Sequence, residues 1–487
     1  MRLDELFPQH TFLPASALLQ VKGVTADSRA VEPGFVFYAV PGVKADGLSF
    51  AQAAIAKGAI AVVSERDPER PILGAALVRV DDVRAALSHS AAALHPRQPE
   101  TIVAVTGTSG KTSVAVFTQQ IWIACGKPAA LLGTIGIVAP NGSVKGSLTT
   151  PDPVSLHQAL DELAGEGVSH LVMEASSHGL DQRRLDSVRL SAAAFLNLSR
   201  DHLDYHKDLD EYLDAKLRLF RVLMPKGAPA IVDADSDVSD RVIKAATEAG
   251  LKVLTIGKKG TYLRLVSAEA DGLNTRLVLN FDGHDHAVVL PLAGSFQVAN
   301  AMAAASFCLA TGSDSAQVFA ALEKLRGAPG RLDLVGTRGT APVFVDYAHK
   351  PDALEKALLA LRPFASNRLI VVFGCGGDRD TGKRAIMGDI AARFADFVIV
   401  TDDNPRSEEP NAIRSAIVDG ARAAKKAPVV DIGDRASAIR SGVSMLKDGD
   451  VLLIAGKGHE TGQIVGKETF PFSDHEAARA ALKEFKA

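Results

Sequence analysis

The residues Thr106-Gly107-Thr108-Ser109-Gly110-Lys111-Thr112 have the types and the spacing that bind nucleotide phosphates. They are a shortened form of the pattern G-x-x-x-x-G-K-[ST], because two residues separate Gly107 from Gly110, and three separate Thr106 from Gly110, where the pattern has four. Backbone N–H groups at a helix N-terminus cradle phosphate oxygens, the Lys111 ammonium can reach the outer phosphates, and the Thr112 hydroxyl can ligate Mg²⁺. An ordinary glycine turn is the competing interpretation. We disfavour it because a β-branched run, 102–105, enters the stretch and an amphipathic segment, 114–123, leaves it.

A carboxylate at the end of another apolar run, Glu174, is a second candidate for metal chemistry. A carboxylate at a buried strand end must be paired or bound to a cation. Mg²⁺ takes a few protein oxygens together with substrate phosphates, so Thr112 and Glu174 are placed for one ion. The alternative role for Glu174 is a structural salt bridge.

Two histidines and a lysine follow the next predicted strand. His202 and His206 form an i, i+4 pair that invites a zinc interpretation, but a third good zinc ligand is not obvious and the phosphate loop favours magnesium. Lys216 lies at the margin of an apolar helical stripe made by Leu213, Leu217 and Phe220. Taken alone, such a lysine is typical of a helix surface with its charged end in water.

A third group of polar residues lies near the C-terminus, in Asp403-Asn404-Pro405-Arg406 and Gly456-Lys-Gly-His-Glu460. Arg406 can bind a carboxylate through two parallel hydrogen bonds, and the acidic residues Asp403 and Glu460 can bind an ammonium group. Both stretches follow predicted strands, so together they indicate a pocket for a zwitterion. Without that context, Asn-Pro is only a turn signal.

The elements that must position these residues alternate between apolar strands and helical windows. Strands predicted at 102–105, 171–174 and 192–196 indicate a parallel sheet with helices on both faces, and ligands gather at the carboxyl ends of such strands. Strands predicted at 343–345, 369–373, 397–401 and 451–455 indicate a second α/β region of the same kind. The strands predicted at 263–267, 275–281 and 286–290 alternate and suggest an antiparallel meander. A small α/β unit precedes them, and its helix at 81–94 has Asp81 as the expected N-cap.

Composition limits the classes of protein that the chain can belong to. The chain has 487 residues, of which 47% are apolar and 23% charged, and a formal net charge of −3. This charge gives no field that favours nucleic acid or an anionic membrane. Three scattered cysteines, Cys125, Cys308 and Cys375, support neither a disulfide framework nor a structural zinc site. No apolar run reaches the roughly 18 residues of a spanning helix. We therefore expect a cytoplasmic protein without nucleic-acid or membrane partners.

The ordered motifs resemble those of the Mur ligases of peptidoglycan synthesis, in particular the type that adds 2,6-diaminopimelate to UDP-N-acetylmuramoyl-L-alanyl-D-glutamate. The similarity covers the whole chain and rests on these motifs: 27–29, 106–112, 149–151, 174–180, 197–206, Lys216, Asn300, 330–333, 346–349, 374–384, 403–406 and 456–460. It implies a three-domain α/β architecture: a small N-terminal UDP-sugar-binding domain at 1–98, a central parallel-sheet ATP-binding domain at 99–328 and a C-terminal Rossmann-like amino-acid-binding domain at 329–487.

The resemblance also implies a reaction and the residues that perform it. The D-glutamyl carboxylate attacks the γ-phosphate of ATP, and the amino group of meso-diaminopimelate attacks the resulting acyl phosphate. The catalytic residues would be Lys111, Glu174, His202 and Lys216, with Thr112 and Glu174 on one Mg²⁺ and with His202 and Lys216, as N6-carboxylysine (a carbamate), at a second. ATP would contact the whole loop, which is Thr106, Gly107, Thr108, Ser109, Gly110, Lys111 and Thr112, and also Asn300, Arg331 and Asp346.

The resemblance assigns the other two substrates in the same way. UDP-MurNAc-L-Ala-D-Glu would contact Ser28, Val43, Lys44, Ala45, Thr149, Thr150, Ser176, Gln182 and Arg184. Diaminopimelate would contact Arg379, Asp403, Asn404, Pro405, Arg406, Gly456 and Glu460. The predicted specificity for diaminopimelate rests largely on Arg406, since relatives that add L-lysine usually lack this arginine. We take the enzyme to act on these small molecules as a monomer.

Two other functions share part of this pattern. A folylpolyglutamate synthetase has the same loop and a carbamylated lysine, but the motifs 27–29 and 403–406 argue against it. A nucleotide-binding switch would not need the zwitterion pocket. Departures from the family pattern are few: Ser109 stands where asparagine is common, and Leu148 stands where some relatives have asparagine, so that contact is not carried over.

Overall fold

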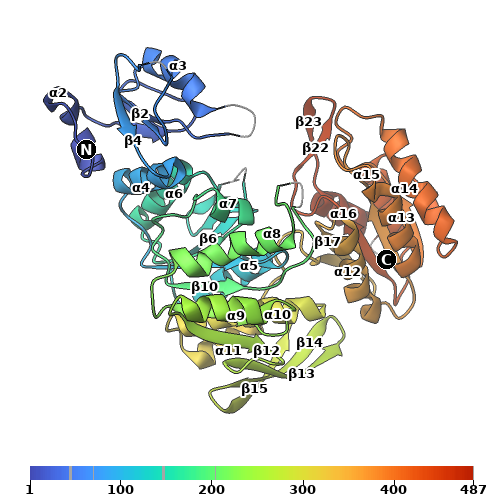
Figure 1. Ribbon diagram of the computed structural model, residues 1–487. Helices are drawn as coiled ribbons and strands as arrows, with labels where there is room; N and C mark the ends of the chain where they lie inside the picture. Colours follow the sequence, from blue (N-terminus) through green and yellow to red (C-terminus); the bar gives the residue numbers. More distant parts are fainter. Residues whose placement is uncertain (43–45, 70, 145–147, 203–204, 486–487) are drawn as a thin grey trace. The chain divides into compact units, whose positions relative to one another are not determined.

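The computed structural model describes the chain of 487 residues except 43–45, 70, 145–147, 203–204 and 486–487. It divides into two compact units. The first contains Met1–Arg264 and Met302–Val318, and the second contains Leu265–Ala301 and Phe319–Ala487. Figure 1 labels the helices and strands and colours the chain by residue number. The predicted substrate contacts Val43, Lys44 and Ala45 therefore lie outside the described residues. Among the described residues, no helix is both long and apolar enough to cross a membrane.

The first unit begins with a four-stranded parallel sheet in the order β1-β2-β3-β4. Residues of β2 alternate between two small cores, with Val36 and Tyr38 in one and Phe37 in the other, so both faces of this sheet are covered. Its strands are β1 (Gly23–Thr25), β2 (Phe35–Tyr38), β3 (Ala61–Ser64) and β4 (Ala76–Arg79). Its helices are α1 (Leu3–Leu6), α2 (Pro14–Ala17), the 3₁₀ turn η1 (Gly47–Phe50), α3 (Ala51–Ala56) and α4 (Val83–Leu94).

The N-cap predicted for the last of these helices was wrong by one residue. Asp82, not Asp81, caps α4: its carboxylate accepts a hydrogen bond from the N–H of Ala85. Both aspartates satisfy the composition rule for an N-cap, and only the backbone path of the preceding turn decides between them.

The larger sheet of the first unit has the strand order β12-β11-β10-β5-β9-β6-β7-β8. Strands β12 to β6 in this order are parallel, and β7 and β8 complete the sheet in antiparallel fashion. The strands are β5 (Thr101–Thr106), β6 (Ala129–Gly133), β7 (Gly136–Ala139), β8 (Gly142–Val144), β9 (His170–Glu174), β10 (Ala192–Phe195), β11 (Pro229–Asp233) and β12 (Lys252–Gly257). The helical segments are α5 (Lys111–Ala124), α6 (Pro153–Gly165), α7 (Ser177–Asp181), α8 (Leu209–Arg218), the π-helical turn η2 (Leu219–Leu223) and α9 (Ser239–Glu248).

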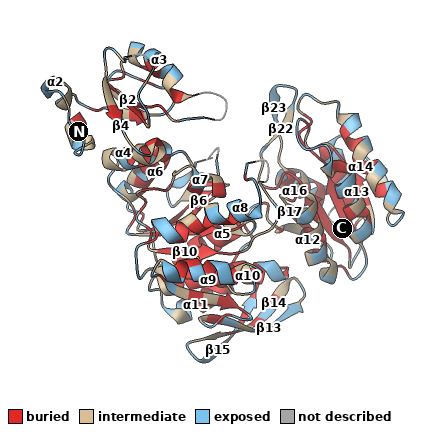
Figure 2. Cartoon of the chain, viewed as in Figure 1, coloured by how far each residue is buried: buried red, intermediate tan, exposed pale blue. Residues whose placement is uncertain are grey.

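Strand β5 explains why this sheet forms. Ile102, Val103, Ala104 and Val105 are all fully buried, which is the pattern of a parallel strand covered on both faces. The neighbouring strand β10 is likewise buried (Figure 2). The predicted parallel α/β region is confirmed. The predicted meander is confirmed for β14 (Asn274–Phe281) and β15 (His284–Leu290), which pair in antiparallel fashion around Asp282 and Gly283. Both turn residues have positive φ angles, as a tight hairpin turn requires. Strand β13 (Leu263–Asp271), by contrast, begins parallel to β12.

The second unit contains a six-stranded sheet in the order β16-β17-β21-β18-β19-β20, parallel except for β16. Helices α12, α13 and α14 share one core with the sheet, and α15 and α16 share another, so the sheet is doubly wound. The strands are β16 (Asp333–Arg338), β17 (Ala341–Asp346), β18 (Leu369–Phe373), β19 (Phe397–Val400), β20 (Val429–Asp431) and β21 (Val451–Ala455), and a separate hairpin contains β22 (Gly462–Val465) and β23 (Glu468–Pro471). The helices are α10 (Ser295–Ala310), which crosses from this unit into the first, α11 (Ser315–Leu322), α12 (Pro351–Leu361), the 3₁₀ turn η3 (Arg362–Phe364), α13 (Lys383–Phe394), α14 (Pro410–Ala424), α15 (Arg435–Ser444) and α16 (Asp474–Glu484).

Candidate functional site

The phosphate loop lies where three parallel strands end together. Val105 of β5 is paired with Glu174 of β9, and Thr106 is paired with Phe195 of β10. Gly107 and Gly110 have φ angles of 150° and 91°, and α5 begins immediately afterwards at Lys111. A side chain at Gly107 would place its Cβ 3.1 Å from the Cβ of Leu196. The loop therefore needs a glycine at this point to turn from strand to helix against the neighbouring strand end.

Residues after β10 hold the loop in shape. The amide of Asn197 accepts a hydrogen bond from the N–H of Ser109 (2.9 Å) and donates one to the Ser109 carbonyl (3.2 Å). The hydroxyl of Thr108 accepts from the N–H of Ser199 at 3.0 Å. Asn197 was quoted in the sequence motif but given no role. As the second residue after a parallel strand, it could have been found by the rule that polar groups at such ends serve the site.

Two lysines converge on one backbone oxygen of this loop. The ammonium groups of Lys111 and Lys216 donate to the carbonyl of Gly107 at 2.9 Å and 3.0 Å. Lys216 is only 1% exposed, so the expectation of a surface lysine from its helical stripe was wrong. Burial, with the charge of Lys111 nearby, lowers the pKa of Lys216 well below its usual value. The Tyr212 ring centroid lies 4.2 Å from Nζ of Lys216, where the π face supports the ammonium in place of water.

Glu174 is held by a residue that sequence reasoning missed. Its carboxylate, 1% exposed, accepts hydrogen bonds from the N–H (2.8 Å) and hydroxyl (3.1 Å) of Thr134. Gly133 leaves room for it, because a Cβ there would overlap the carboxylate. The salt-bridge alternative fails among the described residues, where no cation pairs with Glu174. Thr112, in the first turn of α5, is also buried.

His202 belongs to a cluster of aromatic side chains. Its ring centroid lies 4.9 Å from that of His178 and 6.0 Å from that of Tyr212. The backbone N–H of His202 donates to the carboxylate of Asp201 at 2.8 Å, and the φ angle of His202 is 52°. His206, the other half of the predicted pair, packs against Tyr205 and Tyr212. Among the residues that the structure describes, no group of three or more His, Cys, Asp or Glu side chains could hold a metal, so the zinc interpretation gains no support.

The residues predicted to contact the nucleotide-sugar peptide form one hydrogen-bonded network, apart from Ser28 and the three outside the described residues. The Thr149 hydroxyl lies 3.1 Å from that of Thr134, so this network begins beside Glu174. The remaining hydrogen bonds run from the Ser176 hydroxyl to the Thr150 hydroxyl (3.1 Å), from Arg184 to the Thr150 carbonyl (2.7 Å) and from Arg184 to Gln182 (2.7 Å). Ser28 lies in the turn after β1, next to Asp27 and Arg29, which pair with each other.

The N-terminal helix α4 contacts the loop that carries Gln182 and Arg184. Arg183, between them, has a φ angle of 60° and pairs with Asp82 at 2.9 Å. Its carbonyl accepts a hydrogen bond from the Ser88 hydroxyl at 2.6 Å. A non-glycine residue with positive φ persists only when its surroundings fix it, so these two contacts determine the path of the loop.

Three predicted nucleotide contacts lie in the second unit and are linked to one another. The amide of Asn300 donates to Gln297 at 3.1 Å, and Gln297 donates to the Arg331 carbonyl at 3.2 Å. The guanidinium of Arg331 lies 4.8 Å from the Tyr347 ring centroid. Asp346 accepts hydrogen bonds from the N–H groups of Leu332 and Ala348, both at 2.7 Å. Burial raises the pKa of this carboxyl, against the nearby charge of Arg331.

The predicted amino-acid pocket is built at the carboxyl ends of β18, β19 and β21. Nδ2 of Asn404 donates to Glu460 at 3.0 Å. Asp403 is buried with one unpartnered oxygen, and burial raises its pKa. Gly456 is required beside it, because a Cβ there would lie 2.5 Å from that oxygen. Arg379 is exposed on the loop after β18.

Arg406 is the residue on which diaminopimelate specificity was predicted to depend. Its guanidinium donates to the Gly377 carbonyl at 2.8 Å, and within the described residues it forms no ion pair. Its φ angle of 52° is held by two backbone hydrogen bonds to the hairpin, from Arg406 N–H to Ile464 (3.1 Å) and from Gly466 N–H to Arg406 (2.7 Å). Pro405, just before it, is buried. The arginine is therefore rigid at its backbone and has a charge not yet neutralised.

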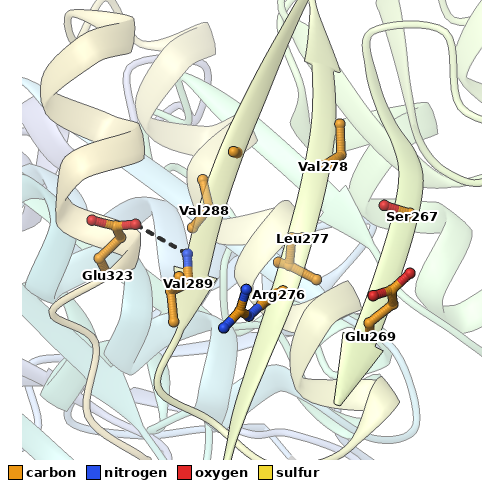
Figure 3. A pocket seen from close by; sticks show the side chains of 9 residues that line it. Ser267, Glu269, Arg276, Leu277, Val278, Val288, Val289 and Glu323 are labelled. Atoms are coloured by element: carbon orange, nitrogen blue, oxygen red, sulfur yellow. Dashed lines mark hydrogen bonds between the residues drawn. The ribbon is translucent and has the colours of Figure 1, made fainter. Parts of the chain in front are cut away.

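A separate hollow of about 470 Å³ lies on the antiparallel strands β13, β14 and β15 (Figure 3). The Glu323 carboxylate borders it and accepts a hydrogen bond from the N–H of Val289 at 3.0 Å. None of its lining residues is a predicted site residue, and valine and leucine side chains form much of it. It is a surface depression of the hairpin rather than part of the loops described above.

A phosphate loop at the carboxyl ends of a parallel sheet defines the class of protein as a nucleotide-binding α/β protein. Models of three successive domains match the chain: the Mur ligase family catalytic domain at 20–95, the Mur ligase middle domain at 105–308 and the Mur ligase glutamate ligase domain at 330–458. The chain belongs to the Mur ligase family, whose members form amide bonds at the expense of ATP. The predicted fold class is confirmed, whereas the boundaries at 98 and 328 stay predictions.

Individual relatives agree over nearly the full length. UDP-N-acetylmuramoyl-L-alanyl-D-glutamate–2,6-diaminopimelate ligase of Bradyrhizobium diazoefficiens is 57% identical, covering 99% of each chain. The enzyme of that name in Brucella melitensis is 55% identical, covering 99% of this chain and 98% of its own. A solved structure of a ligase with this name has a TM-score of 0.74 at 34% identity, covering 99% of both chains. A folylpolyglutamate synthase from Mycobacterium tuberculosis has a TM-score of 0.62 at 18% identity over 82% of this chain and 94% of its own, a likeness of fold alone.

Proposed function

We propose that this protein is an ATP-dependent ligase that adds meso-2,6-diaminopimelate to the D-glutamate of UDP-MurNAc-L-Ala-D-Glu, a step of peptidoglycan precursor synthesis. The observation that carries the proposal is the agreement between Arg406, whose backbone is held and whose guanidinium has no carboxylate partner among the described residues, and relatives that are named for diaminopimelate. A substrate with a second carboxylate supplies the partner that this arginine lacks.

The reaction has two bond-forming steps. A glutamyl carboxylate oxygen attacks the γ-phosphorus of ATP and ADP leaves, which gives an acyl phosphate. The diaminopimelate nitrogen then attacks the acyl carbon, inorganic phosphate leaves and an amide remains. Negative charge accumulates on phosphate oxygens in the first step, and positioned cations and backbone N–H groups stabilise it. Lys111 and the loop N–H groups supply them, while Asn300, Arg331 and Asp346 bind the rest of the nucleotide.

The donor atoms of the first unit suit Mg²⁺. The Thr112 hydroxyl and the Glu174 carboxylate are hard oxygen ligands, and Thr134 fixes the carboxylate while leaving oxygen lone pairs for an ion. Bound Mg²⁺ would neutralise phosphate charge. Burial beside Lys111 lowers the pKa of Lys216 and so favours its neutral amine. The neutral amine is the form that reacts with CO₂. The resulting carbamate would offer oxygen, with His202, to a second ion.

The remaining site residues divide between the other two substrates. The network of Thr149, Thr150, Ser176, Gln182 and Arg184 binds the nucleotide-sugar peptide next to Glu174, and the pocket around Asn404 and Glu460 receives the zwitterionic end of diaminopimelate. We expect the reaction in the cytoplasm, where ATP and nucleotide-linked precursors are made, and a monomer stays our prediction for the assembly.

The decisive experiment incubates the protein with ATP, Mg²⁺, UDP-MurNAc-L-Ala-D-Glu and either meso-diaminopimelate or L-lysine. We expect phosphate release, and a product heavier by one diaminopimelate residue, only with diaminopimelate. Release with lysine but not diaminopimelate would reject the specificity, and ATP hydrolysis independent of any amino acid would favour a nucleotide switch.

A further inference from the structure

A fully buried lysine, Lys457, lies between two of the residues assigned to the amino-acid pocket. It is 0% exposed and follows Gly456 at the carboxyl end of β21. Its ammonium donates to Oδ1 of Asn404 at 2.9 Å and to Oε2 of Glu460 at 3.2 Å. Lysine is almost never fully buried unless it is paired, so the burial of Lys457 indicates that its contacts have a specific role.

The contacts of Lys457 fix the orientation of the Asn404 amide. Oδ1 accepts from Lys457 and also from the N–H of Ile464 at 2.9 Å. A flipped amide would turn its NH₂ group towards these two donors, which is unfavourable in a buried place. Nδ2 therefore points to Oε2 of Glu460, at 3.0 Å.

The same contacts leave one oxygen of Glu460 for a ligand. Oε2 receives two donors, from Asn404 and Lys457. Oε1 accepts no hydrogen bond within the part of the chain that the structure describes. The ammonium also balances the charge of the carboxylate, which is partly exposed, and helps to hold its Oε2 in place.

We propose that Lys457 is a positioning residue for the amino-acid substrate: it locks Asn404 and Glu460 so that Oε1 of Glu460 faces the ammonium group of a zwitterionic amino acid. Lys457 itself does not touch the substrate. The inference rests on the proposed function, because it assumes that these loops bind diaminopimelate.

The test is the steady-state kinetics of Lys457→Met, which keeps most of the side-chain volume and removes the charge. We expect the KM for diaminopimelate to rise about 10- to 100-fold, with the KM for ATP and kcat changed less than about threefold. Arg368→Met is the matched control. It removes a cation from a pair with the buried Asp450, and it lies just before β18, at the end of the strand away from the pocket. Its KM values should match those of the wild type.

A double-mutant cycle separates positioning from general support of the fold. If Lys457 acts through Glu460, then Lys457→Met and Glu460→Gln together should raise the KM for diaminopimelate no more than the larger single effect. Losses that multiply, or an unchanged KM in Lys457→Met, would overturn the proposal. Should Lys457→Met fail to fold, Lys457→Gln replaces it. Failure of both to fold, with Arg368→Met folded, would give Lys457 a structural role and also overturn it. Wild-type enzyme that does not use diaminopimelate would reject the proposed function instead.

Discussion

The two loop regions of this protein treat charge in opposite ways. At the phosphate loop, the ammonium groups of Lys111 and Lys216 share one carbonyl oxygen, and Lys216 forms no ion pair among the described residues. At the loops of the second unit, cations are paired with carboxylates: Arg435 with Asp474, Lys457 with Glu460 and Arg414 with Asp402. The first region places two lysine side chains on one backbone oxygen, whereas the second pairs these three cations with carboxylates.

The difference follows from the ligands that each region is proposed to bind. A polyphosphate brings several negative charges, and its affinity benefits from uncompensated cations. A zwitterion brings both signs, so selection depends on where each partner is held rather than on net charge. Arg406 is the exception in the second region, and its uncompensated charge is what a second carboxylate of the substrate would need.

The largest expected effect comes from removing one of the two converging lysines. Lys216→Ala should lower kcat by about 10³-fold or more, because it removes the side chain that we propose becomes a carbamate and would offer oxygen to a metal ion. Added bicarbonate should not restore activity, since alanine has no amine to modify. Phosphate release measures this, and a thermal melt checks folding. Near-normal turnover would mean that Lys216 is not needed for the reaction.

A smaller effect should follow from Arg406→Ala in the balanced region. Loss of a bidentate charged contact costs about 1.5–3 kcal/mol, or roughly 10- to 150-fold in affinity. The KM for diaminopimelate should rise by this factor and the KM for ATP should not. Titration of diaminopimelate and ATP in turn gives both values. Equal losses for the two ligands would count against a carboxylate pocket.

Thr134→Val tests the support of Glu174 without touching a cation. Valine keeps the shape and the backbone N–H contact but removes the hydroxyl that donates to Glu174 and lies near Thr149. One lost hydrogen bond to a charged group predicts about a tenfold rise in the Mg²⁺ concentration for half-maximal rate. A Mg²⁺ titration at saturating ATP measures it. An unchanged requirement would remove Thr134 from the site.

Asp233→Asn, at the end of β11, should not change turnover, but it should change stability. Burial raises the pKa of Asp233 to about 6 from 3.8, so its ionised form opposes folding. Stability from this group is full below about pH 4 and is lost as the pH rises through about 6. Asparagine should therefore stabilise the protein by about 3 kcal/mol at pH 8 and little at pH 4. Denaturant melts at the two pH values test this, and the same gain at both would contradict the pKa.

The strands and their ends could be predicted because a strand that is buried on both faces is a continuous run of apolar residues. Residues 102–105 are apolar throughout, and the residues that follow such runs are the loops described above. Thr134 obeys the same rule, directly after β6, and could have been found in this way. The helical position of Lys216 was also read correctly, as a member of α8.

What the sequence could not reveal was which partner each side chain would find. The stripe of α8 places Lys216 at its margin, but burial depends on the Gly107 carbonyl, which lies 109 positions earlier in the chain. Lys457 stands in a glycine-rich stretch that looks solvated, and only the fold brings Asn404 and Glu460 to its ammonium. Contacts between residues so far apart in the chain cannot be predicted from the local pattern of apolar and polar residues.

The contact of Asp82 and Ser88 with Arg183 has a consequence for dividing the chain. A fragment starting at residue 99 would retain the whole phosphate loop, yet the segment with Gln182 and Arg184 would lose both of its anchors to α4. Such a truncated protein should still retain ATP on an affinity column while the sugar peptide washes through. Residues of α4 thus hold the conformation of a loop that lies about 100 positions later in the chain.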